Sequence, residues 1–402
     1  MSWAKEKIGQ VATVVTKGTT PTTYGMPFTE SGVNFVKAEA LNGDCTLDRA
    51  GFTCVAESTH EKLGRSILEE GDVLLTIAGA QVGRCGIVRE EHLPANTNQA
   101  VGIIRLDREQ ANPKFVYYHF KNPRTFQMCQ GIGGQAAQPN INLTVLKGFE
   151  LPLPEVRTQE AVVEILSAYD DLIENNRRRI ALLEQAARML YREWFIHLRF
   201  PGHEHAKITN GLPEGWERQK LVDVVDLVKD NVLPANFAED EIHIGLEHIP
   251  RRSFTLADWE PAKDLASGKT RFAEGDILFC KIRPYFHKVG FALRSGLASS
   301  DAIVWRVKDP SDWPMVVCAT SSDHFVAVAS KTVKEGSKMP RADLKVLHGY
   351  ALLKPPEGLL GIFNDTVLPI TQQCKALALA NRALAEARDL LLPRLMNGEI
   401  AV

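Results

Sequence analysis

The sequence lacks paired cysteines and long apolar runs. Its seven cysteines are scattered over 402 residues and none forms a Cys-x-x-Cys pair, which favours neither a zinc ribbon nor a disulfide framework. The start, Met1–Lys7, is polar and has no apolar signal core. No stretch approaches the roughly 20 apolar residues that a membrane helix needs. We therefore expect a reduced, cytoplasmic protein that does not associate with membranes.

The sequence also lacks the motifs of enzymes that act on nucleic acids. It has no P-loop and no Asn/Asp-Pro-Pro-aromatic loop of an amine methyltransferase, because the Pro-Pro pair at 355–356 lies between Lys354 and Glu357. The glycine-rich segments 79–83 and 131–134 do not fit a strand–GxGxxG–helix pattern with an acidic residue about 20 positions later. We predict that this chain is not an enzyme and carries no cofactor.

A metal site is not indicated either. His203 and His205 flank Glu204 and have the composition of a metal-binding pair. They lie in a polar linker without a third ligand nearby, so we interpret them as part of a solvated loop.

Charge is nearly balanced overall but is unevenly distributed. The chain has 47 Lys and Arg against 49 Asp and Glu, a formal charge of −2, which argues against a protein that coats nucleic acid without specificity. Segment 331–345 holds five basic and two acidic residues. This local excess of positive charge favours contact with phosphates.

What the sequence does contain is an internal repeat with a spacing of about 200 residues. The segment 68–75, LEEGDVLL, returns at 272–279 as FAEGDILF, and 139–149, PNINLTVLKGF, returns at 340–350 as PRADLKVLHGY. Each copy then runs into a long helical pattern. A duplicated module with a duplicated helix predicts a pseudo-twofold molecule, which suits a ligand with two similar halves, and DNA is the commonest of these.

The repeat divides the chain into five parts. We predict β-rich modules at 1–155 and 217–355, long helices at 156–198 and 356–402, and a linker at 199–216. Strands are expected at 73–77 and 101–106, and a short helix at 113–120. The fold class is α/β (α+β), with two β-rich modules joined by two long helices.

Both long helices carry a heptad seam. Mostly apolar residues step by three and four from Val162 to Trp194 and from Leu360 to Leu395, and each seam contains one asparagine, Asn176 or Asn381. We predict that the helices form an antiparallel coiled coil; the alternative is that each packs on its own module. Pro369 and Pro393 are expected to kink the second helix near its start and disturb its end.

Loops after the Gly-Asp strands are the first candidate DNA-contacting surface. In the second module, Lys281, Arg283 and Tyr285 alternate along an extended run and are expected to share one face. Arginine is the commonest reader of guanine. The candidates are Thr76, Gln81, Arg84, Lys281, Arg283, Tyr285 and Lys288.

Two further pairs of loops supply the remaining candidates. Segment 97–99 matches 299–301, and the glycine-containing segment 133–140 matches 335–341. Glycine permits close approach to phosphates, and amide and basic side chains match base edges. A flexible connector or a solvated turn is the alternative for any one of these residues: Asn98, Gln99, Gly134, Gln135, Gln138, Asn140, Lys334, Ser337, Lys338 and Arg341.

Trp194 and Phe195, near the end of the first long helix, are large apolar residues that a partner protein could bury. The alternative is that they complete the core beside the linker.

These features resemble the specificity subunit of type I restriction–modification systems. The resemblance covers essentially the whole chain and is carried by 151–160, LPLPEVRTQE, by 165–176, ILSAYDDLIENN, and by 390–400, LLLPRLMNGEI. It implies two target recognition domains, each reading one half of a split, asymmetric sequence in double-stranded DNA. It also implies docking of two methyltransferase subunits and a motor-nuclease subunit, which would hold S-adenosylmethionine, ATP and Mg.

We therefore predict a non-catalytic recognition subunit that directs methylation and cleavage by its partners. The alternative from another class is a duplicated coiled-coil scaffold that recruits proteins without reading DNA.

Overall fold

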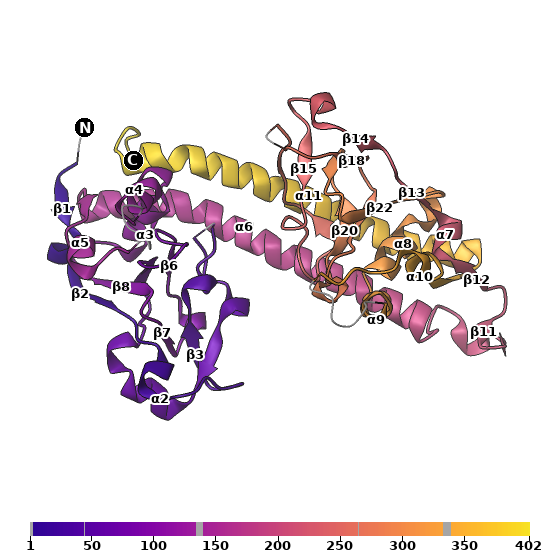
Figure 1. Cartoon of the computed structure of the whole chain (residues 1–402), viewed down its shortest axis with the longest axis horizontal. Coiled ribbons are helices and arrows are strands. Elements are labelled where there is room, and N and C mark those ends of the chain that lie inside the picture. The colour runs from indigo at the N-terminus through magenta and orange to yellow at the C-terminus, as the bar shows by residue number, and fades with distance from the viewer. Residues whose placement is uncertain (1–2, 44, 134–139, 264, 333–338) are drawn as a thin grey trace. The chain divides into compact units, whose positions relative to one another are not determined.

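The structure is a computed structural model that describes residues 3–43, 45–133, 140–263, 265–332 and 339–402. The chain forms two compact units (Figure 1). Unit 1 comprises Met1–Asp171 and Leu384–Val402, and unit 2 comprises Leu172–Ala383. Each unit therefore takes one β-rich module together with a part of both long helices. Among the described residues, no helix is both long and apolar enough to cross a membrane.

Unit 1 is built on an antiparallel sheet with the strand order β2-β8-β5-β6. Helix α3, Pro113–Lys121, begins where the sequence predicts, because Pro113 occupies its first turn and the Asn112 side chain accepts hydrogen bonds from the backbone of Lys114 and Phe115. A second sheet has the order β4-β3-β7. The strands are β2 Ala12–Lys17, β3 Val33–Val36, β4 Thr53–Val55, β5 Val73–Thr76, β6 Cys85–Ile87, β7 Ala95–Thr97 and β8 Val101–Leu106.

Unit 2 repeats this sheet and adds a strand. Its order is β13-β22-β19-β20-β16, and β16, the added edge strand, pairs in parallel with β20. A second sheet has the order β14-β18-β21-β15-β17. The strands of the two sheets are β13 Val225–Leu227, β14 Asn231–Val232, β15 Ile242–Ile244, β16 Thr255–Leu256, β17 Glu260–Pro261, β18 Lys269–Phe272, β19 Ile277–Cys280, β20 Val289–Ala292, β21 Gly296–Ala298 and β22 Ala302–Val307.

Short elements complete each unit. They are α1 Ile8–Val11, α2 Glu57–Lys62, α4 Pro123–Gly133, α5 Leu143–Lys147, β1 Lys5–Lys7 and β9 Glu150–Pro152 in unit 1, and α7 Leu221–Val224, α8 Trp313–Thr320, α9 Asp323–Lys331, α10 Leu344–His348, β10 Ile208–Thr209, β11 Leu212–Pro213, β12 Glu217–Lys220 and β23 Ala351–Lys354 in unit 2. Strands β1 and β9, like β12 and β23, pair antiparallel and join the two ends of each module.

The repeated Gly-Asp sequence has a structural cause. Gly71 and Gly275 adopt φ of 90° and 84°, a left-handed region that favours glycine. The following aspartate is buried in both units. The Asp72 carboxylate accepts bonds of 2.8 and 2.9 Å from Arg105, and Asp276 accepts bonds of 2.8 and 2.7 Å from Arg306. Each pair ties the tight turn to the neighbouring central strand.

The two long helices are α6, Val156–Tyr191, and α11, Glu357–Met396. A π-helical turn, Arg192–Ile196, extends α6. Helix α11 continues through Pro369 and Pro393, so neither proline ends it. Within unit 2, later residues of α6 contact earlier residues of α11, which confirms the antiparallel packing. Asn176 donates to Asn381 at 2.9 Å, and the Trp194 and Phe363 rings are 5.7 Å apart.

Each unit buries its own core. In unit 1, apolar residues of the sheet and α3 pack with Val162 and Leu166 of α6 and with Leu392 and Leu395 of α11. In unit 2, a larger core includes Ala187 of α6 and further residues of α11. The seam of each helix is therefore shared: one part packs in unit 1, and another in unit 2.

Candidate nucleic-acid interface

Three loops meet at one end of the main sheet in unit 1. The backbone N–H of Ile77 donates to Ala100 at 2.8 Å, and the N–H of Ile141 donates to Ile77 at 2.7 Å. Ala78 and Asn140 form an isolated antiparallel bridge. These bonds bring together segments 76–84, 97–100 and 140–141, which we call the loop end of unit 1.

Unit 2 has the same arrangement. The N–H of Lys281 donates to Asp301 at 3.1 Å, and the N–H of Ala342 donates to Lys281 at 2.8 Å. Ile282 and Arg341 form the bridge. The loop end of unit 2 thus comprises segments 280–288, 299–301 and 340–342. The repeat extends from sequence to backbone hydrogen bonding, and loops predicted separately form one surface in each unit.

Amide and basic side chains at the loop end of unit 1 are held by hydrogen bonds. In the orientation that satisfies both ends of its amide, Gln81 donates to the Ala38 carbonyl at 3.1 Å and accepts from Arg84 at 3.2 Å. Arg84 also donates to the Leu41 carbonyl at 3.3 Å. Gln99 is exposed and accepts a hydrogen bond from the Thr20 hydroxyl. These contacts hold the side chains in place on a polar surface.

The other candidates in unit 1 differ in accessibility. Asn140 is exposed, and Asn98 is half-buried. Thr76 is fully buried at the end of β5, with a hydroxyl that has no hydrogen-bond partner among the described residues. The prediction that Thr76 contacts DNA is therefore wrong, because every residue of β5, Thr76 included, is buried inside unit 1.

Two candidates in unit 2 are occupied by internal contacts. Lys281 donates to the Ser300 carbonyl at 2.7 Å and lies 3.2 Å from the Asp301 carboxylate. Lys288 donates to the Leu246 carbonyl at 2.5 Å, and burial lowers the pKa of its amine. Arg341 is more exposed and pairs with Asp301 at 3.2 Å. Lys281 and Lys288 therefore shape the loop end, whereas Arg341 is placed at its surface.

Arg283 and Tyr285 project from a constrained turn. Both side chains are exposed, and Tyr285 has an exposed fraction of 54%. Arg283 and His287 flank the 3-10 turn Pro284–Phe286 with φ of 48° and 54°. Residues other than glycine rarely adopt this left-handed backbone conformation, because their Cβ atom crowds the backbone. The surrounding contacts must therefore hold the turn. This turn is the most prominent candidate for base contact in unit 2.

Residues that the sequence reasoning missed surround this turn. The Arg251 guanidinium lies 4.2 Å from the centroid of the Phe286 ring. The backbone N–H of Arg252, itself at φ 57°, donates to the His287 carbonyl at 2.9 Å. The adjacent pair of arginines was a visible signal, but nothing in the sequence indicated that it lies beside 284–287. In unit 1, Arg65 donates to the Thr19 hydroxyl at 3.0 Å beside the same end of the sheet.

Six predicted contacts lie outside the described residues. They are Gly134, Gln135, Gln138, Lys334, Ser337 and Lys338.

Trp194 and Phe195 do not form a partner surface, which corrects the prediction. Their exposed fractions are 7% and 2%. The Phe195 ring packs against Phe363 and Trp216, with centroids 5.0 and 5.6 Å away. The linker residue Trp216 therefore covers the helix end from within the same chain, and the two aromatic residues complete the core of unit 2.

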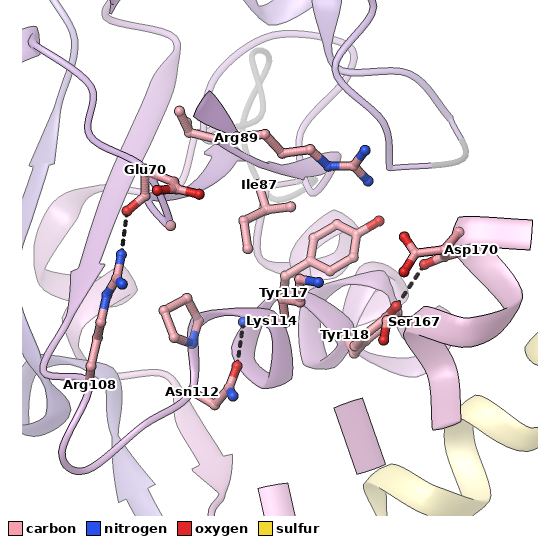
Figure 2. Close-up of a pocket in the computed structure, with 14 residues that line it drawn as sticks. Glu70, Ile87, Arg89, Arg108, Asn112, Lys114, Tyr117, Tyr118, Ser167 and Asp170 are labelled. Atoms are coloured by element: carbon pink, nitrogen blue, oxygen red, sulfur yellow. Dashed lines mark hydrogen bonds between the residues drawn. The ribbon is translucent and has the colours of Figure 1, made fainter. Parts of the chain in front are cut away.

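A pocket of about 290 Å³ lies in unit 1 where β6 and α3 face α6. Figure 2 shows Asp170 of α6 pointing to the Tyr118 hydroxyl, which donates to it at 2.8 Å. The lining includes basic Arg89 and Arg108 beside acidic Glu70 and Asp170. Charges of both signs lie side by side, so the pocket does not offer the positive surface that phosphates require.

His243, His248 and Glu260 of unit 2 form a group with ligand atoms within 4.8 Å of one another. The sequence reasoning missed it because Glu260 is distant in sequence. His243 Nδ1 lies 2.8 Å from Glu260, and Gly245 N–H donates to His248 Nδ1 at 2.9 Å. The neutral His248 ring must then keep its proton on Nε2, which leaves that atom no lone pair for a metal. As arranged, the group is a hydrogen-bonded cluster rather than a ready metal site.

Comparison with known proteins agrees with this architecture. The family model described as type I restriction modification DNA specificity domain matches residues 2–185. The MjaIX specificity subunit of Methanocaldococcus jannaschii is 23% identical over 100% of this chain and 94% of its own length. The HindI specificity subunit of Haemophilus influenzae is 20% identical, over 65% of this chain and 71% of its own length.

A solved structure has the same fold. The S subunit of a type I restriction–modification system from M. genitalium superposes with a TM-score of 0.58 at 14% identity, over 98% of this chain and 96% of that one. The MjaIX and HindI relatives are both named as specificity subunits of type I restriction enzymes. Residues 2–185 thus match the type I restriction modification DNA specificity domain, and the whole chain is similar to type I restriction–modification specificity subunits.

Proposed function

We propose that each loop end reads one half of a split DNA sequence and that the paired helices fix the gap between the halves. One observation carries this proposal: the same backbone hydrogen bonds frame both loop ends, while the side chains on the two frames differ. Unit 1 presents Gln81, Arg84 and Gln99, whereas unit 2 presents Arg283, Tyr285 and Arg341. Different donors and acceptors on equivalent frames should select different bases. The site should therefore be asymmetric.

The long helices support the spacer role. The 36 residues of α6 span about 54 Å at 1.5 Å per residue. One turn of B-DNA is about 34–36 Å, so this length is sufficient to separate two contact sites on one face of the duplex. Asn176 and Asn381 pair in the seam and fix the register of the helices.

The partners in this proposal are two methyltransferase subunits and a motor-nuclease subunit. The chemistry, with S-adenosylmethionine, ATP and Mg, would reside in those subunits. The target adenine would be flipped from the duplex into the methyltransferase pocket, since a base cannot react inside the stack. Apolar side chains exposed on the helices, rather than Trp194 and Phe195, are the candidates for docking: Leu182 on α6 and Leu390 on α11 have exposed fractions of 65% and 73%.

Mapping methylated adenines in the source genome tests this proposal. The expected result is one split, asymmetric motif, and deletion of the gene for this chain should abolish its methylation. A gel shift with the recovered motif, using the full chain and its methyltransferase partner, should show preference over a scrambled duplex. Arg283→Ala should weaken this preference, whereas Arg218→Ala, on β12 outside the loop end, should not.

The same experiment separates DNA reading from the scaffold alternative. A scaffold would bind the methyltransferase but would give no motif and no preference between the two duplexes.

A further inference from the structure

A buried carboxylate on α6 holds the strand that unit 2 adds to the repeated sheet. Glu184 has an exposed fraction of 2%. Its Oε1 atom accepts hydrogen bonds from Ser253 Oγ at 2.8 Å, the N–H of Phe254 at 3.1 Å, and the N–H and hydroxyl of Thr255 at 3.0 and 2.7 Å. A buried carboxylate with this many donors is firmly fixed, because moving it would leave several polar groups unsatisfied.

Arg188, one helical turn further along α6, completes this contact. It lies 3.3 Å from Glu184, and its guanidinium carbon is 5.0 Å from the centroid of the Phe254 ring. Two residues on one face of α6 therefore hold segment 253–255: Glu184 by hydrogen bonds and Arg188 by packing on the Phe254 ring.

The segment held by Glu184 contacts the turn 284–287, the candidate for base contact in unit 2. Arg251 packs on Phe286, and Arg252 donates its backbone N–H to His287. Both contacts join segment 251–255 to the turn 284–287, in which His287 and the preceding residue Arg283 have positive φ. Such a turn keeps its shape where neighbouring contacts impose it. Glu184 thus touches no candidate reading residue but fixes the segment that braces them.

Unit 1 has no equivalent among its described residues. Its sheet ends at β6, without a fifth strand to match β16. The helix position that corresponds to Glu184, as Asn381 corresponds to Asn176, is Asp389, which pairs with Arg388 at 2.7 Å. The contact is therefore a feature of one half of the repeat.

We propose that Glu184 is a positioning residue that sets sequence discrimination by unit 2 from the spacer helix. The proposal rests on DNA reading by the loop ends. Removing the negative charge should release segment 251–255, loosen the turn 284–287 and relax base preference in the half-site of unit 2. The half-site of unit 1 should be unaffected, because its loop end is framed by other bonds.

The test is selection of bound sequences from a pool of randomised duplexes by the full chain with its methyltransferase partner. The test variants are Glu184→Gln and the milder Thr255→Val. The matched control is Glu174→Gln, which removes an exposed ion pair with Arg178 on the same helix. Arg283→Ala identifies the half-site that unit 2 reads. Glu184→Gln should lower discrimination in that half by up to about tenfold per base pair, since a mismatch normally costs about that much or more. Thr255→Val, which removes one of the four hydrogen bonds to Glu184, should lower it by less.

Amide hydrogen exchange on the same samples separates the two proposals. Glu184→Gln should speed exchange in 251–256 and 284–288 without changing 77–84. Unchanged exchange in 284–288 would overturn the positioning role, whatever the DNA result. Equal loss of preference in both half-sites would also overturn it, because a merely structural defect acts that way. If the wild type selects no sequence while the exchange pattern follows the prediction, the proposed DNA reading is refuted. The proposed effect of Glu184 on the conformation of segments 251–256 and 284–288 is then retained.

Discussion

Replacing Asp170 by asparagine should destabilise unit 1 selectively. Asp170 lies on α6 and accepts a hydrogen bond from Tyr118 at 2.8 Å, while its carboxylate lies 3.2 Å from Lys121 and 2.5 Å from Arg388. The side chains of Lys121 and Arg388 have exposed fractions of 6% and 9%. One carboxylate therefore joins α3, α6 and α11, and it neutralises two nearly buried cations.

The magnitude follows from what Asp170→Asn leaves behind. Removing one member of a buried ion pair typically costs about 3–5 kcal/mol, because the remaining charge is uncompensated. Tyr118 can still donate to the amide oxygen, and Arg388 keeps Asp389 at 2.7 Å. We therefore expect the lower end of this range, about 3 kcal/mol, or about a hundredfold in an unfolding equilibrium.

Amide exchange of α3 is the suitable assay, since each unit has its own core and a single unfolding transition is not assured. Exchange in Pro113–Lys121 should rise about a hundredfold, while β19, Ile277–Cys280, in unit 2 serves as an internal control. A rise of less than about threefold in α3 would refute the reasoning, because it would mean that water already solvates the two cations.

The same variant has a pH signature. Burial raises the pKa of Asp170, but Lys121, Arg388 and the Tyr118 hydroxyl more than offset this, and the pKa lies below its ordinary value of 3.8. A depressed pKa contributes stability that is complete above the ordinary value and is lost as the pH falls through the folded one. The wild type should therefore lose its advantage over Asp170→Asn below pH 3.8 and keep it at neutral pH.

Three other changes test separate parts of the structure. Arg283→Ala should weaken binding to the recovered DNA motif and, if the guanidinium contacts phosphate, should lower the slope of log K against log salt by about one, measured by titration in increasing salt. Asp276→Asn should cost about 2 kcal/mol in unit 2 by removing the charged bonds from Arg306, and exchange in β19 and β22 measures this. Asn176→Leu alone should cost about 1–3 kcal/mol because it leaves Asn381 Oδ1 without its donor, yet the double Leu variant should be neutral or stabilising in thermal unfolding. Additive single and double effects would show that the two amides do not interact.

The sequence was sufficient for features that depend on local pattern. The heptad seams predicted both long helices, and their length required a partner surface longer than one module provides. The repeated Gly-Asp motif predicted equivalent strands, because a tight turn with φ near 90° needs glycine and the buried aspartate needs its arginine. The antiparallel pairing was predicted from the duplication, because two copies of a module–helix unit adopt this arrangement when they close a pseudo-twofold.

The tertiary structure alone decided which residues face outward and what they touch. Thr76 and Trp194 were chosen for their chemistry, but burial depends on packing against distant segments, such as Phe363 for Trp194. The arginine pair of segment 251–255 was visible in the sequence, but its position was not, because that position depends on Glu184 about 70 positions earlier and on the turn about 30 positions later. The repeated backbone arrangement could thus be predicted from the sequence. That Glu184 of α6 holds segment 253–255 in unit 2, without a counterpart in the described part of unit 1, depends on contacts between segments that are far apart along the chain.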